Sequence, residues 1–421
     1  YLTMDPSRPA VDSTVLMYMI YDKTQGCWSE PKKVDTDATM DWTASLYSNG
    51  ETVRLVYVQQ DKLLSEGIGI NDLTTGMKIT SAIFDFEKME FIDFQDVAKS
   101  NNEVYVSRPA ITEKENVPII YWVQGPTDDY FGTNSENSIY YSSLGDTGWS
   151  EAELLVKGRN CITELAAGYI GLDAGVAFVT DSDNNLDTDD DRIITIVSGE
   201  KELEVATGEV CNILFGVLPG QMNPSLLWFS DGNIAVLSAT ENETQYLFLE
   251  NEEGVLSNSV ESDFRIVGNK ILFSKTDVSG NVGVYSISYE NETYGNSISI
   301  VSATGSISSF AATDNMAVWV DTETTMQEGL IEDYSAIGYC LYNEQYDLQA
   351  LYADYTWEKL EPGKEISVTI GVQNNTDTEI TTLYVTVLNT NEEVVFDTFT
   401  DCNIASGASD EIEVVITAPL D

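Results

Sequence analysis

The segment from Asp181 to Asp191 carries the densest set of side chains in this sequence that could do chemistry. Carboxylate or amide oxygens occur there at alternate positions. Hard cations such as Ca²⁺ bind about six to eight oxygen ligands, and alternation lets side chains converge while the backbone wraps around the ion. The candidate ligands of a weak Ca²⁺ site are therefore Asp181, Asp183, Asn185, Asp187 and Asp189.

This segment is not an EF-hand loop, because it lacks that loop's glycine at the sixth position and its bidentate glutamate at the twelfth. A second interpretation is a solvated acidic turn between the second and third strands of a β-sheet, since runs of like charge are commonly exposed. The sequence alone leaves both interpretations open.

Two adjacent aromatic residues, Tyr130 and Phe131, are the candidate binding residues. They lie in a polar stretch from Gly125 to Gly132 that is rich in turn residues, so we expect both rings to be exposed. An aromatic ring at a loop tip can stack on a sugar or anchor in a pocket of another protein. The alternative is that the two rings pack only within their own loop.

The overall composition excludes several kinds of chemistry. The 421 residues include no histidine, which removes the commonest general base and every Ser-His or Cys-His nucleophile pair. Lys and Arg number 20 against 70 Asp and Glu, and a net charge of −50 disfavours nucleic acid and anionic membranes. The five cysteines lie far apart and predict buried thiols, with no disulfide framework. No apolar run is long enough for a membrane helix.

A glycoside hydrolase stays open as the alternative enzyme function, because such enzymes need only two suitably spaced carboxylates. With 70 acidic residues, the sequence neither excludes such a pair nor identifies it. A sialidase is disfavoured, since it needs converging arginines and the six arginines here are dispersed along the chain. We therefore predict no catalytic residues.

The elements that must position these residues are β-strands. Short apolar runs bounded by Gly, Asn, Asp and Ser recur along the chain, and helical periodicity is scarce. The most apolar runs are 53–58, 118–123, 175–180, 234–239, 271–276 and 317–321. Each follows a shorter apolar strand and a turn, so each is predicted to be the second strand of a hairpin, buried on both faces.

Two further strands follow each hairpin, and the repeat is that of a four-stranded propeller blade. Six such units run from about residue 38 to about residue 353, after two strands at 13–22 and 26–34 that stand alone. The sequence thus predicts a β-propeller of seven blades, the first incomplete, with six blades as the alternative. The orphan strands would be the third and fourth strands of the first blade. The chain is expected to be a piece of a longer protein.

The pattern of apolar and polar residues changes near residue 352. The stretch 353–421 holds about five to seven short strands with one polar face, which predicts a small immunoglobulin-like β-sandwich. The predicted domains are therefore a propeller at 1–352 and a sandwich at 353–421.

Several motifs resemble the propeller segments of large secreted surface proteins of Gram-positive, often gut-dwelling, bacteria. The motifs are two Trp-Ser-Glu strands at 28–30 and 149–151, the loop 132–141 and the acidic stretch 178–192. The tail from Pro362 to Asn374 resembles a CARDB-type adhesion sandwich. These resemblances imply a secreted or cell-surface location and a role in binding.

The predicted function is non-catalytic binding or adhesion, with a glycan or another protein as ligand at the cell surface. Ca²⁺ is the one cofactor expected. Neither nucleic acid nor membrane insertion is expected, and the chain is expected to be monomeric. A structural spacer without a ligand is the third possibility, beside the glycosidase.

Overall fold

A computed structural model describes the chain from residue 1 to residue 417 with internal gaps. The residues outside the description are 24–25, 171, 200, 231–232, 239–244, 248–263, 277–281, 291–292, 295–297, 303–305, 314–315, 328–329, 342–347, 356–364, 375–379, 389–393, 406–407 and 418–421. Of the tail from Pro362 to Asn374 that carries the CARDB resemblance, residues 362–364 lie outside the described residues.

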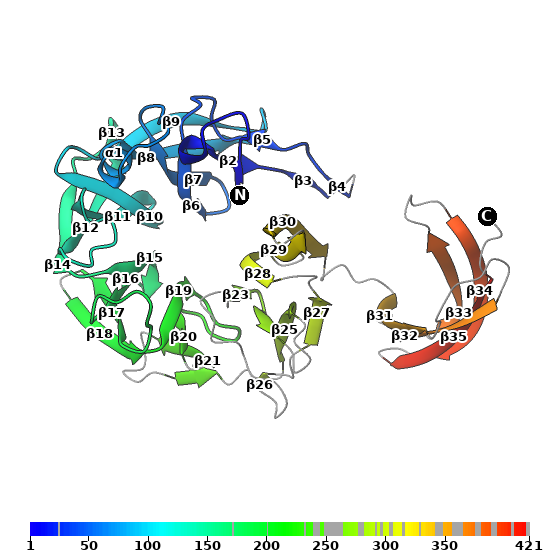
Figure 1. Ribbon diagram of the computed structural model, residues 1–421. Coiled ribbons are helices and arrows are strands. Elements are labelled where there is room, and N and C mark those ends of the chain that lie inside the picture. Colours follow the sequence, from blue (N-terminus) through cyan, green and yellow to red (C-terminus); the bar gives the residue numbers. More distant parts are fainter. Residues whose placement is uncertain are drawn as a thin grey trace. The chain divides into compact units, whose positions relative to one another are not determined.

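The described strands confirm the all-β prediction and form a seven-bladed propeller arrangement (Figure 1). The first sheet contains β1 (Leu2–Met4), β2 (Thr14–Tyr18) and β5 (Lys32–Lys33), and the second contains β6 (Asp41–Ser48), β7 (Val53–Gln60), β8 (Met77–Asp85) and β9 (Glu90–Lys99). The third sheet contains β10 (Val104–Lys114), β11 (Val117–Pro126), β12 (Asn137–Gly145), β13 (Gly148–Trp149) and β14 (Glu153–Arg159). The fourth sheet contains β15 (Ile162–Ile170), β16 (Asp173–Asp181), β17 (Arg192–Ser198) and β18 (Lys201–Gly208).

Three more sheets continue the series. The fifth sheet contains β19 (Val210–Gly216), β20 (Ser225–Ser230), β21 (Asn233–Ser238) and β22 (Gln245–Leu247). The sixth contains β23 (Phe264–Val267), β24 (Lys270–Thr276), β25 (Val282–Glu290), β26 (Thr293–Tyr294) and β27 (Ile298–Ser302). The seventh contains β28 (Ser306–Thr313), β29 (Met316–Gln327) and β30 (Leu330–Leu341). The described helices are a 3-10 turn η1 (Ala10–Asp12) and α1 (Ile70–Thr75), and neither is long or apolar enough to cross a membrane.

The first sheet has three strands where the sequence predicted two. Leu2–Met4 forms β1 and pairs antiparallel with β2, and β2 pairs in turn with β5. The stretch 21–28 forms a separate hairpin of β3 (Tyr21–Asp22) and β4 (Cys27–Trp28). The predicted fourth strand at 26–34 is therefore split between this hairpin and β5.

The repeated Trp-Ser-Glu motif has a structural role that explains its recurrence. In both copies the serine Oγ accepts a backbone N–H from the other side of the hairpin. Ser29 accepts that of Ile20 (3.0 Å), and Ser150 accepts that of Ser143 (3.2 Å). Each serine hydroxyl also lies 3.1 Å from the carbonyl of the following glutamate, within hydrogen-bond distance. The motif thus ends a short hairpin and leads into the outer strand, because the serine satisfies backbone groups where the ladder breaks.

The second strands are buried on both faces, as predicted. On β11, Ile120 and Trp122 join a core cluster with the second sheet, whereas Tyr121 and Val123 join a cluster with the fourth sheet. The same alternation holds for β7, β16 and β20. The run 234–239 is an exception, since it is the third strand of its sheet and follows β20.

The close fit between the fourth and fifth sheets leads to a testable prediction. Gly168 on β15 is buried, and a Cβ atom there would overlap the ring base of Phe215 on β19. Gly168→Ala should therefore lower the free energy of unfolding by about 1–3 kcal/mol, measured by urea denaturation. In a Phe215→Gly background, which removes the Cβ atom that the new methyl group would meet, the same change should cost almost nothing. An equal cost in both backgrounds would contradict this packing.

The chain divides into two compact units, one of residues 1–312 and 318–338 and one of residues 313–317 and 339–421. The second unit contains one sheet of β31 (Leu348–Tyr355), β32 (Glu365–Asn374) and β35 (Ser409–Thr417) and another of β33 (Ile380–Leu388) and β34 (Val394–Ile404). Residues of β32 to β35 share one hydrophobic core, which includes Val372, Leu383, Ile404 and Ile412. The immunoglobulin-type assignment and the division at residue 352 stay predictions.

Candidate functional site

Two stretches singled out in the sequence lie side by side at one end of the third and fourth sheets. We call residues 182–191, between β16 and β17, the acidic loop, and residues 127–136, between β11 and β12, the aromatic loop. Cys161 links them, because its carbonyl accepts the Asp181 N–H (3.2 Å) and its own N–H donates to the carbonyl of Gly132 (3.1 Å). Cys161 is fully buried, and its thiol is free.

Three carboxylates gather at the base of the acidic loop. Oxygen atoms of Asp181, Asp183 and Asp191 all lie within 4.8 Å of one another. Asp181 is 1% exposed, and burial raises its pKa, with further contributions from Asp191 and Asp183. Three carboxylates at this separation repel one another, and a positive charge between them would relieve the repulsion.

The five predicted metal ligands are only partly brought together. Asp181 and Asp183 belong to the carboxylate cluster, and their Oδ1 atoms both accept the Asn185 N–H, at 3.0 and 2.8 Å. The Asn185 side-chain oxygen accepts the Asp187 N–H (3.3 Å), and neither Asp187 nor Asp189 joins the cluster. The sequence analysis did not identify Asp191, because it followed the alternation of residues along the loop. It did not consider that the pairing of β16 with β17 brings the two ends of the loop together.

The aromatic loop is held by side chains that satisfy its backbone. The Asp129 carboxylate accepts the N–H groups of Thr133 (3.1 Å) and Asn134 (2.7 Å). The buried Tyr105 hydroxyl donates to the carbonyl of Tyr130 (2.8 Å). These bonds tie the loop backbone to its own Asp129 side chain and to Tyr105 on β10.

The two predicted binding residues differ in exposure. Phe131 is 53% exposed, whereas Tyr130 is half-buried against the Tyr105 ring, with centroids 5.0 Å apart. The Tyr130 ring also contacts Phe131 edge to face (5.3 Å) and lies 5.6 Å from the Arg108 guanidinium. Tyr130 therefore supports the loop, and Phe131 presents the accessible ring.

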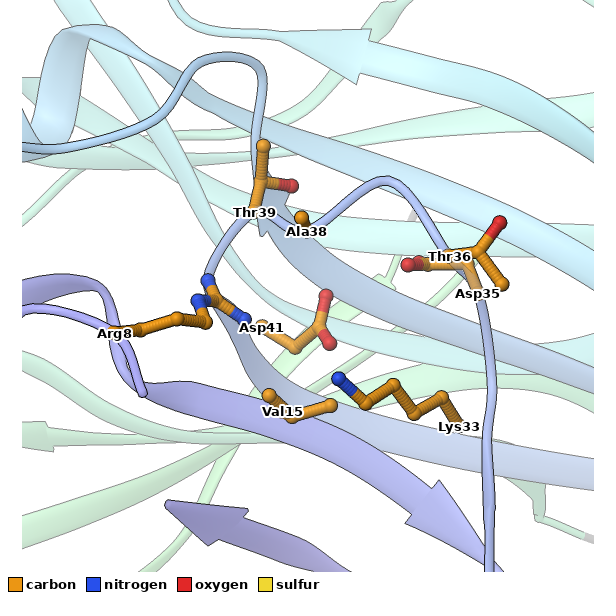
Figure 2. A pocket seen from close by; sticks show the side chains of 8 residues that line it. All are labelled: Arg8, Val15, Lys33, Asp35, Thr36, Ala38, Thr39 and Asp41. Carbon is orange, nitrogen blue, oxygen red and sulfur yellow. The ribbon is translucent and has the colours of Figure 1, made fainter. Parts of the chain in front are cut away.

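A pocket of about 230 Å³ lies where the first sheet leads into the second (Figure 2). Figure 2 shows the Asp41 carboxylate between the side chains of Arg8 and Lys33. The lining residues are Arg8, Val15, Lys33, Asp35, Thr36, Ala38, Thr39 and Asp41. No sequence signal separated these acids from the other carboxylates, because the pocket depends on the pairing of β2 with β5.

Asp41 is the most perturbed group in this pocket. It is 1% exposed, and its Oδ2 accepts the Leu16 N–H (2.8 Å). Burial raises the pKa of Asp41 to about 7, and the neighbouring charges of Asp35 and Asp37 add to this rise. Asp35 accepts hydrogen bonds from the Tyr57 hydroxyl and from the Gln59 amide (3.2 Å). The pocket thus combines a carboxyl that is half protonated near neutrality with other carboxyl groups.

A group of four packed aromatic rings, of which Phe86 is exposed, combines Tyr18 of β2 with three residues at the turn between β8 and β9. The rings of Tyr18, Phe84, Phe86 and Phe91 pack edge to face with centroids 5.2–6.1 Å apart. Phe86 is 59% exposed. The sequence reasoning missed this cluster, although Phe84, Phe86 and Phe91 flank one hairpin turn.

Comparisons with known proteins yield similarity in structure alone. No protein-family model matches the chain, and no curated protein matches it in sequence. Among solved structures it is similar to the polysaccharide lyase Uly1, with 10% identity over 80% of this chain and 86% of that chain (TM-score 0.43). It is also similar to a mutant NanB sialidase from Streptococcus pneumoniae, with 9% identity over 85% and 67% (TM-score 0.40). A third is an alpha-L-arabinofuranosidase from Lactobacillus brevis, with 9% identity over 53% and 79% (TM-score 0.32). At this identity the likenesses assign no activity to the chain.

Proposed function

We propose that this chain is a non-catalytic binding module of an extracellular bacterial surface protein and that it holds a glycan against the aromatic loop. The observation that carries the proposal is the 53% exposure of Phe131 on a loop already ordered by Asp129 and Tyr105. A preordered aromatic ring loses little entropy on binding, so its contact with a sugar face yields affinity. The surface location and the Gram-positive source rest on the sequence resemblance.

The remaining parts of the chain fit this proposal. Propellers present loops from several blades at each end, which suits recognition of an extended ligand. A net charge of −50 suits a non-aggregating extracellular module. The C-terminal unit, which we take to be a CARDB-type sandwich, would act as a spacer or as a second module.

Binding to a glycan array tests the proposal directly. The wild-type chain should bind a defined set of glycans, and Phe131→Ala should weaken that binding at least about tenfold without lowering the melting temperature, since an exposed ring adds little to stability. Leu203→Ala is the matched control, because Leu203 is an apolar side chain exposed to a similar degree, 55%, on β18.

Two outcomes would contradict the proposal. If the chain binds no glycan on the array, a glycan is excluded as the ligand, and a protein ligand or a spacer role is left. Full binding by Phe131→Ala, with loss in Phe86→Ala, would move the binding surface to the aromatic residues at the turn between β8 and β9.

The pocket at Asp41 favours a second candidate function, glycoside hydrolysis. A carboxyl group with a pKa near 7 can act as a general acid when a second carboxylate acts as base or nucleophile, and Asp35 lines the same pocket. Release of reducing sugar from a polysaccharide panel, lost in Asp41→Asn and kept in Glu51→Gln, would establish this function. The binding proposal expects no release.

A further inference from the structure

The base of the acidic loop holds buried oxygen atoms that nothing in the described chain satisfies. Oδ2 of Asp181, Oδ1 of Asp191 and Oδ1 of Asn184 are inaccessible to solvent and accept no hydrogen bond within the described residues. A buried acceptor without a partner is costly, and a buried carboxylate oxygen more so. Two of these oxygens belong to the carboxylate cluster, and Asn184 directly follows Asp183 in the loop, so together they indicate a missing positive partner.

The chain's own cations do not supply that partner. Arg192 lies opposite Asp181 in the β16–β17 register, but within the described residues no ion pair joins Arg192 or any other base to Asp181, Asp183 or Asp191. Arg108, whose charge acts on the nearby Cys161 thiol, donates to the Thr163 carbonyl (3.2 Å) and lies 3.4 Å from the Ser107 hydroxyl.

We propose that Asp181, Asp183 and Asp191, with the side-chain oxygen of Asn184, bind a divalent cation and that this cation is Ca²⁺. All of the donors are oxygen atoms, which excludes a preference for the softer metals. They come from a ten-residue loop and from the strand end beside it. Ca²⁺ accepts irregular coordination, whereas Mg²⁺ needs near-octahedral geometry.

The site should be weak, because the chain supplies few ligands and Asp183 is exposed. Water molecules would complete the coordination. A dissociation constant of about 10⁻⁴–10⁻³ M is typical of extracellular modules. The ion would also tie the acidic loop to β16, because the last residue of that strand is Asp181. The Asp181 N–H donates a hydrogen bond to the Cys161 carbonyl.

Thermal unfolding of the full chain tests the site. Adding 10 mM CaCl₂ to metal-free protein should raise the melting temperature by a few degrees, because the ion binds only the folded form. The rise should disappear in Asp181→Asn and in Asp183→Asn and should persist in Asp189→Asn. Asp189 is the matched control, since it lies in the same loop but outside the cluster.

Calorimetric titration with CaCl₂ provides a second readout, in case a variant changes stability by relieving charge repulsion. Wild type and Asp189→Asn should each show one binding event that the two cluster variants lack. Equal responses in all four proteins would indicate non-specific association with a chain of charge −50 and would overturn the proposal. So would a wild-type chain that gives no response. Neither readout involves a glycan, so this result is separate from that of the array.

Discussion

Asp41→Asn is expected to stabilise the folded chain above pH 7 and to leave its stability almost unchanged below pH 4. Asp41 is 1% exposed, and burial raises its pKa from 3.8 to about 7. Above pH 7 the folded chain must therefore hold a charged carboxylate in a buried place, which lowers its stability. Asparagine keeps the side-chain oxygen that accepts the Leu16 N–H and removes the charge.

The direction of the pH dependence follows from the two pKa values. Between pH 3.8 and about 7, the folded chain binds a proton at Asp41 that the unfolded chain has lost. The free energy of unfolding therefore falls as the pH rises through this window, and the loss is complete above pH 7. Each pKa unit corresponds to about 1.4 kcal/mol, so the largest gain from Asp41→Asn is about 4 kcal/mol.

Other groups in the pocket affect the size of this gain. Burial also raises the pKa of Asp35, which adds to the same slope, whereas Arg8 favours the charged form of Asp41. Urea denaturation at pH 4, 6 and 8 measures the effect. Glu51→Gln is the control, because it removes one exposed carboxylate from a chain whose overall repulsion also grows with pH. A variant less stable than wild type at pH 8 would show that the carboxylate form stabilises the pocket.

Trp122→Ala is expected to lower the free energy of unfolding by about 3–5 kcal/mol. Trp122 on β11 is fully buried and packs with Val58, Ile79 and Tyr105 between the second and third sheets. Its removal leaves a cavity that the surrounding strands cannot close, because their own positions are fixed by hydrogen-bonded ladders.

Trp149→Ala provides the comparison. Trp149 lies at the edge of the same cluster, half-buried, with the Arg54 guanidinium 5.6 Å from its ring, so its loss should cost less. Urea denaturation measures both variants. Equal losses would contradict the central place of Trp122 in this core.

Much of the fold could be predicted from the sequence, because burial on both faces leaves a strong pattern. The continuous apolar runs at 53–58 and 118–123 are second strands, as expected. The run 234–239 was placed one strand too early, since β20 and β21 are equally apolar and local pattern does not order them. Strand β1 was missed because three exposed residues carry no alternation that a sequence can reveal.

The candidate site was harder to predict, because it depends on contacts between distant segments. Tyr130 and Phe131 were found from loop composition, but the role of Tyr105 requires knowledge of the fold. Asp191 closes the acidic loop only when β16 and β17 pair, and Asp41 enters its pocket only when β6 follows the first sheet. The identity of the ligand depends on shape and charge at these loops and stays a proposal.

The alternation of side chains on β7, β11, β16 and β20 has a consequence for how the chain unfolds. Each of these strands completes two hydrophobic cores at once. Loss of one blade therefore exposes apolar surface on both of its neighbours, and isolated melting of an inner blade is disfavoured. Leu218 and Tyr130 are loop residues that join these cores, so insertions should accumulate in the other loops, where they do not weaken the cooperative unit.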